Sequence, residues 1–220
     1  MKKKYKWMPL AKYEVKCPYK MKPIGITVHD TANDASAQNE IDYMISNNEF
    51  TSYHVAIDDS EAIQCIPFDR NAFHAGDGAN GTGNRKTIGI ETCYSKSGGA
   101  KYDKAFDNVL NYVCELMKKY GFSEKDVYYH KHWSGKNCPH RLLSKGITQE
   151  KYRKLVKERY DQMYKKKDYV GHWAENAIKE VVKKDIMSFN KDGNFRPDDK
   201  VTRAELASVI ARAIKLFEKK

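Results

Sequence analysis

Short segments rich in β-branched and aromatic residues alternate with stretches of helical periodicity, and this alternation constrains the fold most strongly. Apolar residues at helical spacing predict a helix capped by Ser36, a second that stops at Gly121 and a third that begins after Thr148. We therefore predict an α/β domain with a central mixed β-sheet flanked by helices. The predicted strands are residues 24–28, 54–58, 62–66, 87–92 and 127–130.

The sequence changes character after residue 163. A charged linker, residues 164–168, is followed by two apolar-striped segments, Trp173 to Ile186 and Thr202 to Phe217, on either side of the turn-rich loop SFNKDGNFRPDDK. We predict a first domain over residues 1–163 and a small all-α helix–loop–helix module over residues 169–220. So short a module has a thin core by itself, so we expect it to dock or to self-associate.

The net charge of +11 favours a polyanionic partner, such as nucleic acid, anionic lipid or an acidic cell-wall polymer. No recognition helix or aromatic RNA-binding motif is present, so we predict no nucleic-acid partner. No apolar run approaches the roughly 20 residues of a membrane span, and the basic start lacks the apolar segment of a signal peptide. The five scattered cysteines do not suggest a disulfide framework.

Two histidines and a cysteine have the spacing of a metal site. His29 ends the first predicted strand, in ITVHDT, His130 ends the last one, in VYYH, and Cys138 follows on a loop. Ligands gather at strand ends in α/β sheets, and two imidazoles with one thiolate leave a fourth zinc position for water. Spacing alone leaves open a second interpretation, in which the histidines are polar strand-end residues and Cys138 is a small core residue.

Five motifs, TVHDT, SYHVAID, AFHAGDG, TIGIET and HKHWSGKNCP, occur in this order between about residues 20 and 160. Together they resemble the zinc-dependent N-acetylmuramoyl-L-alanine amidases, a family shared by phage endolysins, bacterial autolysins and peptidoglycan-recognition proteins. The resemblance implies one zinc ion per chain on His29, His130 and Cys138, with His132 as an alternative ligand at the wrong spacing from Cys138. It implies hydrolysis of the amide between N-acetylmuramic acid and the L-alanine of the peptidoglycan stem peptide.

The resemblance also assigns roles to individual side chains. Glu91 matches the family glutamate that takes a proton from the attacking water, a role suited to a carboxylate beside zinc. Lys136 matches a lysine that faces the developing oxyanion. Some relatives use a tyrosine at the position of Tyr53 in place of the glutamate, so beside Glu91 the resemblance implies that Tyr53 lines the substrate site. His74 falls where the family has a groove residue near the substrate, and a purely structural role stays open for both residues. His54 alternates to the other strand face from Tyr53 and is predicted to be a satisfied core histidine.

Two other chemistries compete with this interpretation. Cys138 acting as a nucleophile with a histidine base would resemble the cysteine amidases, but it would need a low thiol pKa at a helix N-terminus. A non-catalytic peptidoglycan-recognition protein would keep the fold and lose the zinc ligands. The presence of all three ligands with Glu91 and Lys136 favours an enzyme over a receptor, and also over a wall-anchored structural protein.

The C-terminal motifs GHWA, DGNFRPD and VTRAE resemble an S-layer homology (SLH) repeat. That family binds secondary cell-wall polysaccharide, which implies a binding role for Trp173 and Arg203 through a sugar-facing ring and a two-pronged carboxylate contact. Thr202 and Glu205 also fit a helix capping box, which needs no ligand.

The family usually strings three SLH repeats together, and only one occurs here. The repeat either associates between chains or binds weakly alone. Because a lone repeat buries too little apolar surface, we predict a homo-oligomer formed through residues 168–220. The predicted absence of a signal peptide suggests a phage or prophage endolysin that is made in the bacterial cytoplasm and acts on the wall after release. Its predicted partners are peptidoglycan and an anionic secondary wall polysaccharide, with no nucleic acid and no membrane.

Overall fold

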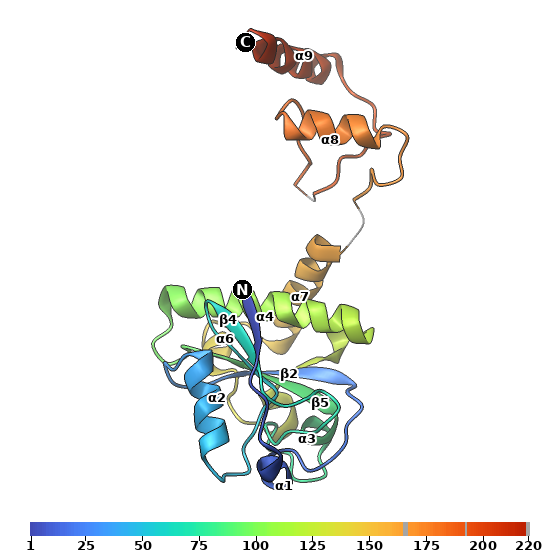
Figure 1. The fold of residues 1–220 in the computed structure, drawn as a ribbon. Helices are drawn as coiled ribbons and strands as arrows, with labels where there is room; N and C mark the ends of the chain where they lie inside the picture. Colours follow the sequence, from blue (N-terminus) through green and yellow to red (C-terminus); the bar gives the residue numbers. More distant parts are fainter. Residues whose placement is uncertain (165–166, 192, 219–220) are drawn as a thin grey trace. The chain divides into compact units, whose positions relative to one another are not determined.

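A computed structural model describes residues 1–164, 167–191 and 193–218 (Figure 1). The chain divides into two compact units, Met1–Tyr160 and Asp161–Lys220. Residues 165 and 166 of the predicted linker lie outside the described residues. Within the described part of the chain, no helix is long and apolar enough to cross a membrane.

The first unit is built on a six-stranded sheet with the strand order β1-β4-β3-β5-β2-β6. The β3–β4 pair is antiparallel and the other pairs are parallel, so the predicted mixed sheet is confirmed. The edge strand β1 was not predicted, because its residues KKKY are mostly charged and all are exposed. The strands are β1 (Lys2–Tyr5), β2 (Gly25–Asp30), β3 (Val55–Ile57), β4 (Glu61–Gln64), β5 (Thr87–Thr92) and β6 (Val127–Tyr129).

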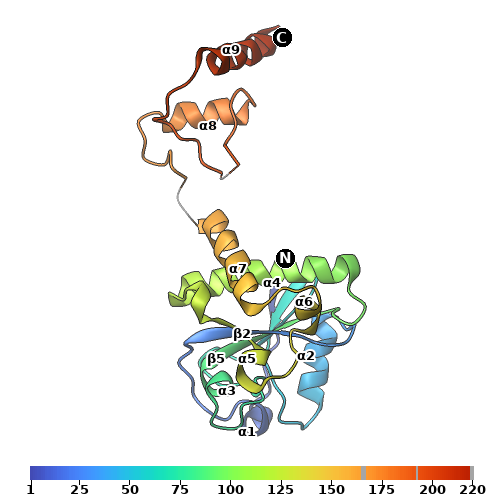
Figure 2. The ribbon, with the colours of Figure 1, turned by 180° about the vertical axis from the view of Figure 1, so that it is seen from behind.

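Helices flank the sheet on both sides. Figures 1 and 2 show α4 on one face and α2, α3 and α5 on the other. The Ser36 side chain accepts a hydrogen bond from the Asn39 N–H at the start of α2, and Gly121 ends α4 in the left-handed conformation at φ +73°, as predicted. The helices are α1 (Tyr13–Lys16), α2 (Ala37–Ser46), α3 (Thr82–Lys86), α4 (Gly99–Tyr120), α5 (His130–Ser134), α6 (His140–Ser144) and α7 (Gln149–Tyr164), with 3₁₀ turns at Leu10–Lys12 and Glu124–Asp126.

The two faces of the sheet differ in chemistry because side chains alternate along each strand. On β2 and β5, Ile26, Val28, Ile88 and Ile90 are fully buried and share one face. The opposite face of the same strands carries Thr27, His29, Thr87 and Glu91. The apolar face forms the core under α4. The polar face carries His29 and Glu91 near the carboxyl ends of β2 and β5.

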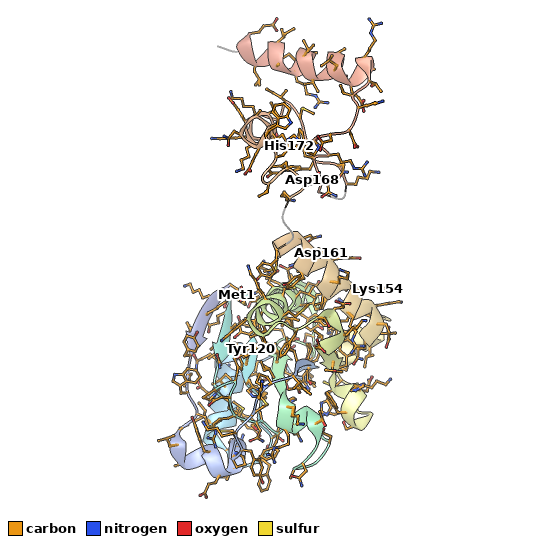
Figure 3. The ribbon with its side chains drawn as sticks, turned by 90° about the vertical axis from the view of Figure 1, so that its right-hand side faces the viewer. Met1, Tyr120, Lys154, Asp161, Asp168 and His172 are labelled. Atoms are coloured by element: carbon orange, nitrogen blue, oxygen red, sulfur yellow. The ribbon has the colours of Figure 1, made fainter. Side chains whose placement is uncertain are left out.

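The second unit contains α8 (Glu175–Lys183) and α9 (Arg203–Phe217), which confirms a helical C-terminal region. Thr202 and Glu205 form the predicted capping box at the start of α9. The loop between the helices is held by Asp168, whose carboxylate accepts hydrogen bonds from the backbone N–H groups of Phe195 and Arg196 at 2.9 and 2.5 Å. Figure 3 labels Asp168 in this unit.

Candidate metal centre

Three potential metal ligands meet in the first unit although they come from different elements. His29 lies on β2, His130 is the first residue of α5, and Cys138 is on the following loop. All three are buried, and their ligand atoms lie within 4.8 Å of one another. The Nδ1 atoms of His29 and His130 are 3.0 Å apart, and the Cys138 Sγ is 3.8 Å from the His29 Nδ1. The structure thus brings together the three residues that the sequence predicts as ligands.

These separations are close to those expected around a small tetrahedral ion. Bonds of about 2.0–2.1 Å to nitrogen and about 2.3 Å to sulfur place tetrahedral donor atoms roughly 3.3–3.6 Å apart. The observed 3.0 and 3.8 Å lie on either side of that range. The cluster is therefore a candidate metal site.

A chain of hydrogen bonds fixes the tautomer of His29. The Thr87 carbonyl can only accept, so the His74 Nε2–H donates to it at 3.2 Å and leaves the His74 Nδ1 as an acceptor. The His29 Nε2–H then donates to that Nδ1 at 3.0 Å. The lone pair of the His29 Nδ1 is therefore free to face His130 and Cys138. Burial lowers the pKa of His74 to about 3, which keeps its ring neutral as this arrangement requires.

His130 is also held in its neutral form. Burial, and then the Lys136 charge, lower the pKa of His130 to about 4. A hydrogen bond between the His130 side chain and the Ala75 backbone opposes this shift. Burial raises the pKa of Cys138 to about 12, so the thiol is protonated unless a cation is bound beside it. The backbone N–H of Asp30 points to the Cys138 Sγ at 3.5 Å and helps to orient it. Two neutral imidazoles and a thiol that a metal would deprotonate form a coherent ligand set.

Glu91 lies beside His29 because the two residues are direct partners in the parallel β2–β5 pair. Its Oε2 is buried and has no hydrogen-bond partner among the described residues. Burial, followed by the charges of Glu40 and Asp30, raises the pKa of Glu91 to about 8, and the charge of Lys136 opposes the shift. A carboxyl group with a raised pKa and an unpaired oxygen is suited to exchanging a proton near neutral pH.

A cavity of about 520 Å³ opens over this cluster and is lined by Glu91, Lys136, Tyr53 and His74 together with the three candidate ligands. Lys136 is exposed at the rim on the loop that precedes Cys138. The Tyr53 hydroxyl is already engaged, since it donates to the Glu40 carbonyl at 2.9 Å. His74 lies behind His29 as well as on the cavity wall. Substrate binding by Tyr53 and His74 stays a prediction.

Two further histidines of the first unit, His132 and His54, are not part of the candidate ligand set. His132 is exposed because β6 ends at Tyr129 and α5 turns the following residues aside, and its ring packs on Tyr128 and Trp133. His54 is fully buried and fully bonded: its Nδ1 accepts from the Gly89 N–H at 2.9 Å, and its Nε2 donates to the Arg70 carbonyl at 2.9 Å.

Two acidic residues near the cluster were missed in the sequence. Asp30 accepts hydrogen bonds from the Tyr102 hydroxyl at 3.0 Å and the Arg141 N–H at 2.8 Å. It thus ties α6, which begins two residues after Cys138, to β2 and α4. Glu40 lines the cavity and is 8% exposed. A clue to Asp30 was its place directly after His29 at the end of an apolar strand, whereas Glu40 lies in an ordinary helical stripe and gives no comparable signal.

In the second unit, Trp173 is 91% exposed and Arg203 is exposed at the first position of α9. No hydrogen bond, ion pair or ring contact joins them among the described residues. Their role as a binding pair stays a prediction.

Comparison with known proteins decides the family. Residues 19–141, which include all three candidate ligands and Glu91, match the family model described as N-acetylmuramoyl-L-alanine amidase. This chain belongs to that family. Residues 167–207 match the S-layer homology domain.

Individual relatives agree with this assignment. The chain is 57% identical over 136 residues to the N-acetylmuramoyl-L-alanine amidase XlyB of Bacillus subtilis, covering 62% of this chain and 43% of XlyB. It is 55% identical over 136 residues to the amidase CwlA of the same organism, covering 62% of this chain and 50% of CwlA. The match therefore spans half or less of these two amidases.

Solved structures show the same amidase fold. The structure of PlyL has a TM-score of 0.68 and 51% identity, and the match covers 71% of this chain and 98% of PlyL. The solution structure of the PlyG catalytic domain gives a TM-score of 0.68 and 51% identity over 73% of this chain and 96% of that domain.

Proposed function

We propose that this amidase-family chain is a zinc-dependent N-acetylmuramoyl-L-alanine amidase. It would hydrolyse the amide between N-acetylmuramic acid and the L-alanine of the peptidoglycan stem peptide. The observation that carries the proposal is the convergence of His29, His130 and Cys138 beside Glu91 in one cavity. The two amidases that share 57% and 55% identity with the chain support the substrate class.

The donor set of two nitrogens and one sulfur suits zinc better than the hard cations, which prefer oxygen ligands. When bound, zinc supplies Lewis acidity that activates water and polarises a carbonyl group. His74 fixes the ring orientation of His29, and the Asp30 backbone orients Cys138.

In this proposal Glu91 transfers protons and Lys136 stabilises negative charge. Glu91 takes a proton from the attacking water through its unpaired carboxylate oxygen and delivers it to the leaving amine of L-alanine. Lys136, at the rim of the cavity, places a positive charge toward the carbonyl oxygen as negative charge develops on it. Tyr53 contributes a wall of the substrate cavity.

The competing functions are less well supported. A receptor without catalysis has no need for a carboxyl group of raised pKa beside a three-ligand cluster. A cysteine nucleophile needs a low thiol pKa, whereas burial raises the pKa of Cys138 to about 12 and its sulfur faces His29 and Asp30.

An assay on purified cell walls tests the proposal. The full chain should release new N-terminal alanine, lose this activity with a chelator and regain it with zinc. Glu91→Gln keeps the size of the side chain but removes the proton acceptor, so the rate should fall about 100-fold or more. Wall binding without new amino termini would indicate a receptor, and a parental rate in Glu91→Gln would remove Glu91 from the mechanism.

For the second unit we propose anchoring to an anionic secondary cell-wall polysaccharide. The match to the S-layer homology domain and the exposed ring of Trp173 support this role. Trp173→Ala and Arg203→Gln should each reduce binding of the full chain to intact walls. Their effect should disappear on walls stripped of the polysaccharide; an equal effect on both kinds of wall would contradict the proposal.

We also propose that the second unit self-associates. Leu206, Ile210 and Ile214 recur at four-residue spacing along α9 and are 48%, 50% and 51% exposed, which leaves an apolar stripe uncovered. A second copy of the same unit would cover this stripe. Light scattering should show an oligomer that becomes a monomer in Leu206→Lys/Ile210→Lys, and a monomeric parent chain would refute it.

Finally, we propose an endolysin role, in which the enzyme is made in the cytoplasm of its host and reaches the wall after release. A Bacillus subtilis protein described as a mutant endolysin shares 39% identity and a TM-score of 0.61 with the chain, and the match covers 68% of the chain and 97% of that protein. Expression in the cytoplasm of a susceptible bacterium should lyse cells only when membrane pores are opened. Lysis without pores would contradict this route.

A further inference from the structure

A second hollow lies at the opposite end of the sheet from the metal centre. It has a volume of about 530 Å³ and is lined by the segment before β2, including Ile24, and by Arg85 and Lys86 before β5. The metal centre is at the carboxyl ends of the same two strands, at His29 and Glu91. His29 lies five residue steps beyond Ile24, which corresponds to roughly 16 Å at 3.3 Å per residue of strand. The hollow is therefore a separate feature of the first unit.

The polar lining of this hollow is strongly basic. Its four cations are Lys20, Lys22, Arg85 and Lys86, and it contains no acidic side chain. Lys20 forms an exposed ion pair with Asp69 at 2.9 Å. The other three have no ion-pair partner among the residues that the structure describes. Three uncompensated positive charges around one hollow create a local field that attracts an anion.

The Arg85 side chain is fixed by an aromatic ring and retains an unpaired hydrogen-bond donor. Its guanidinium stacks over the Tyr19 ring at 3.8 Å, which covers one face of the group. Its Nε is buried yet has no hydrogen-bond acceptor among the described residues. A buried donor without an acceptor is unusual in a folded protein, and a planar guanidinium fixed on a ring is suited to two-pronged contact with a phosphate.

The frame around Arg85 is also fixed. The Ile24 N–H donates to the Lys86 carbonyl at 2.9 Å, and the Met21 N–H donates to the Asp69 carbonyl at 2.7 Å. These bonds hold the segment before β2 against α3 and the loop near Asp69. Met21 and the 47% exposed Ile24 add an apolar wall beside the cations. The hollow thus combines an anion-binding side with a side that suits carbon atoms.

We propose that this hollow binds the phosphodiester groups of an anionic cell-wall polymer. The three unpaired cations contact phosphate oxygens, and Ile24 and Met21 contact the carbons of the glycerol or sugar units between phosphates. A wall polymer as the source of the phosphodiester rests on the proposed amidase function, which places the chain at the wall. Because the hollow and the metal centre are at opposite ends of the sheet, polymer and stem peptide can be bound at the same time.

Binding of a lipid-free glycerol-phosphate oligomer to the full chain, measured by calorimetry, tests the proposal. Arg85→Gln/Lys86→Gln should weaken binding about ten-fold and flatten its salt dependence, because two phosphate contacts are lost. The matched control Lys151→Gln/Lys154→Gln removes the same charge from exposed positions on α7, where Figure 3 labels Lys154, and should change affinity less than two-fold. Lys22→Gln/Lys86→Gln leaves Arg85 in place and alters only exposed lysines. This variant should also weaken binding, and it keeps the proposal testable if replacing Arg85 impairs folding.

Three results would overturn the proposal: no binding of the oligomer, equal weakening in the pocket and control variants, or binding only to phosphatidylglycerol vesicles. An absence of binding would show that the hollow is no site for this polymer, and equal weakening would show that diffuse surface charge attracts it. Binding only to vesicles would identify a membrane surface as the partner. The measurement needs no hydrolysis and can be made with Glu91→Gln. Its failure is therefore distinct from a failure of the amidase proposal.

Discussion

The two units of this chain present their functional side chains in opposite ways. In the first unit the candidate ligands His29, His130 and Cys138 are only 1%, 6% and 5% exposed, and each is oriented by further contacts. In the second unit the candidate binding residue Trp173 is 91% exposed, and α9 leaves an apolar stripe uncovered. The contrast indicates that bond-breaking chemistry requires donor atoms fixed by a buried sheet, whereas anchoring uses a surface completed by its partner.

The largest effect should come from removing a ligand in the first unit. His130→Ala should abolish zinc retention and lower the rate of alanine release by about three orders of magnitude, because the Lewis acid is lost. His132→Ala, two residues away on the exposed side of α5, is the matched control and should keep both. Metal content and wall hydrolysis measured on the same samples decide the matter. Zinc loss in the control instead would make His132 the ligand.

A smaller effect is expected behind the ligand. His74→Ala removes the acceptor that fixes the His29 tautomer, so zinc affinity should fall by about 10–100-fold. Excess zinc should restore most of the rate, which distinguishes positioning from direct participation. Competition with a chromogenic chelator gives the affinity. An unchanged zinc affinity would mean that His29 needs no such support.

The burial of the first unit should also appear in its pH stability. Burial lowers the pKa of His54 to about 4 from an ordinary value of 6.5. Because the unfolded chain takes up this proton first, stability is full above pH 6.5 and falls as the pH drops toward 4. His54 should therefore cost the first unit about 2 kcal/mol of unfolding free energy between pH 7 and pH 5.

Urea unfolding of the metal-free chain at the two pH values tests this expectation. His54→Gln should lower stability at pH 7 yet show a smaller difference between the two pH values than the parent chain. A difference of the same size in both proteins would show that His54 takes no part in the pH response.

The smallest effect is expected in the second unit. Thr202→Ala breaks the capping box at the start of α9 and should cost about 1 kcal/mol of helix stability. Activity of the first unit on small soluble substrates should not change, because Thr202 lies in the other compact unit. Circular dichroism and a soluble-substrate assay measure the two effects. A large loss of activity would show that the units are coupled.

Much of the fold was readable from local sequence. The strands around His29 and Glu91 are rich in β-branched residues, and the helix boundaries follow from Ser36 and Gly121. Strand β1 was not readable, because four exposed residues with three lysines carry no apolar alternation and are held by pairing with β4. Such an edge strand is stabilised by tertiary contacts rather than by local preference.

The site was partly readable for a related reason. The ligand residues have a recognisable spacing, but the contact of His74 with His29 joins residues 45 positions apart and has no local signature. The direction of His132 depended on whether β6 continued past Tyr129, and periodicity cannot place such a boundary to one residue. Asp30 and Glu40 acquire their roles only once β2, α2 and α4 are assembled.

The central claim is that His29, His130 and Cys138 hold one zinc ion, and anomalous diffraction at the zinc edge tests it most directly. In crystals of the full chain grown with zinc, we predict one strong anomalous peak at this cluster. It should lie about 2.0–2.1 Å from the Nδ1 atoms of His29 and His130 and about 2.3 Å from the Cys138 Sγ. Saturating zinc without a peak at this cluster, or a peak held by other side chains, would contradict the account.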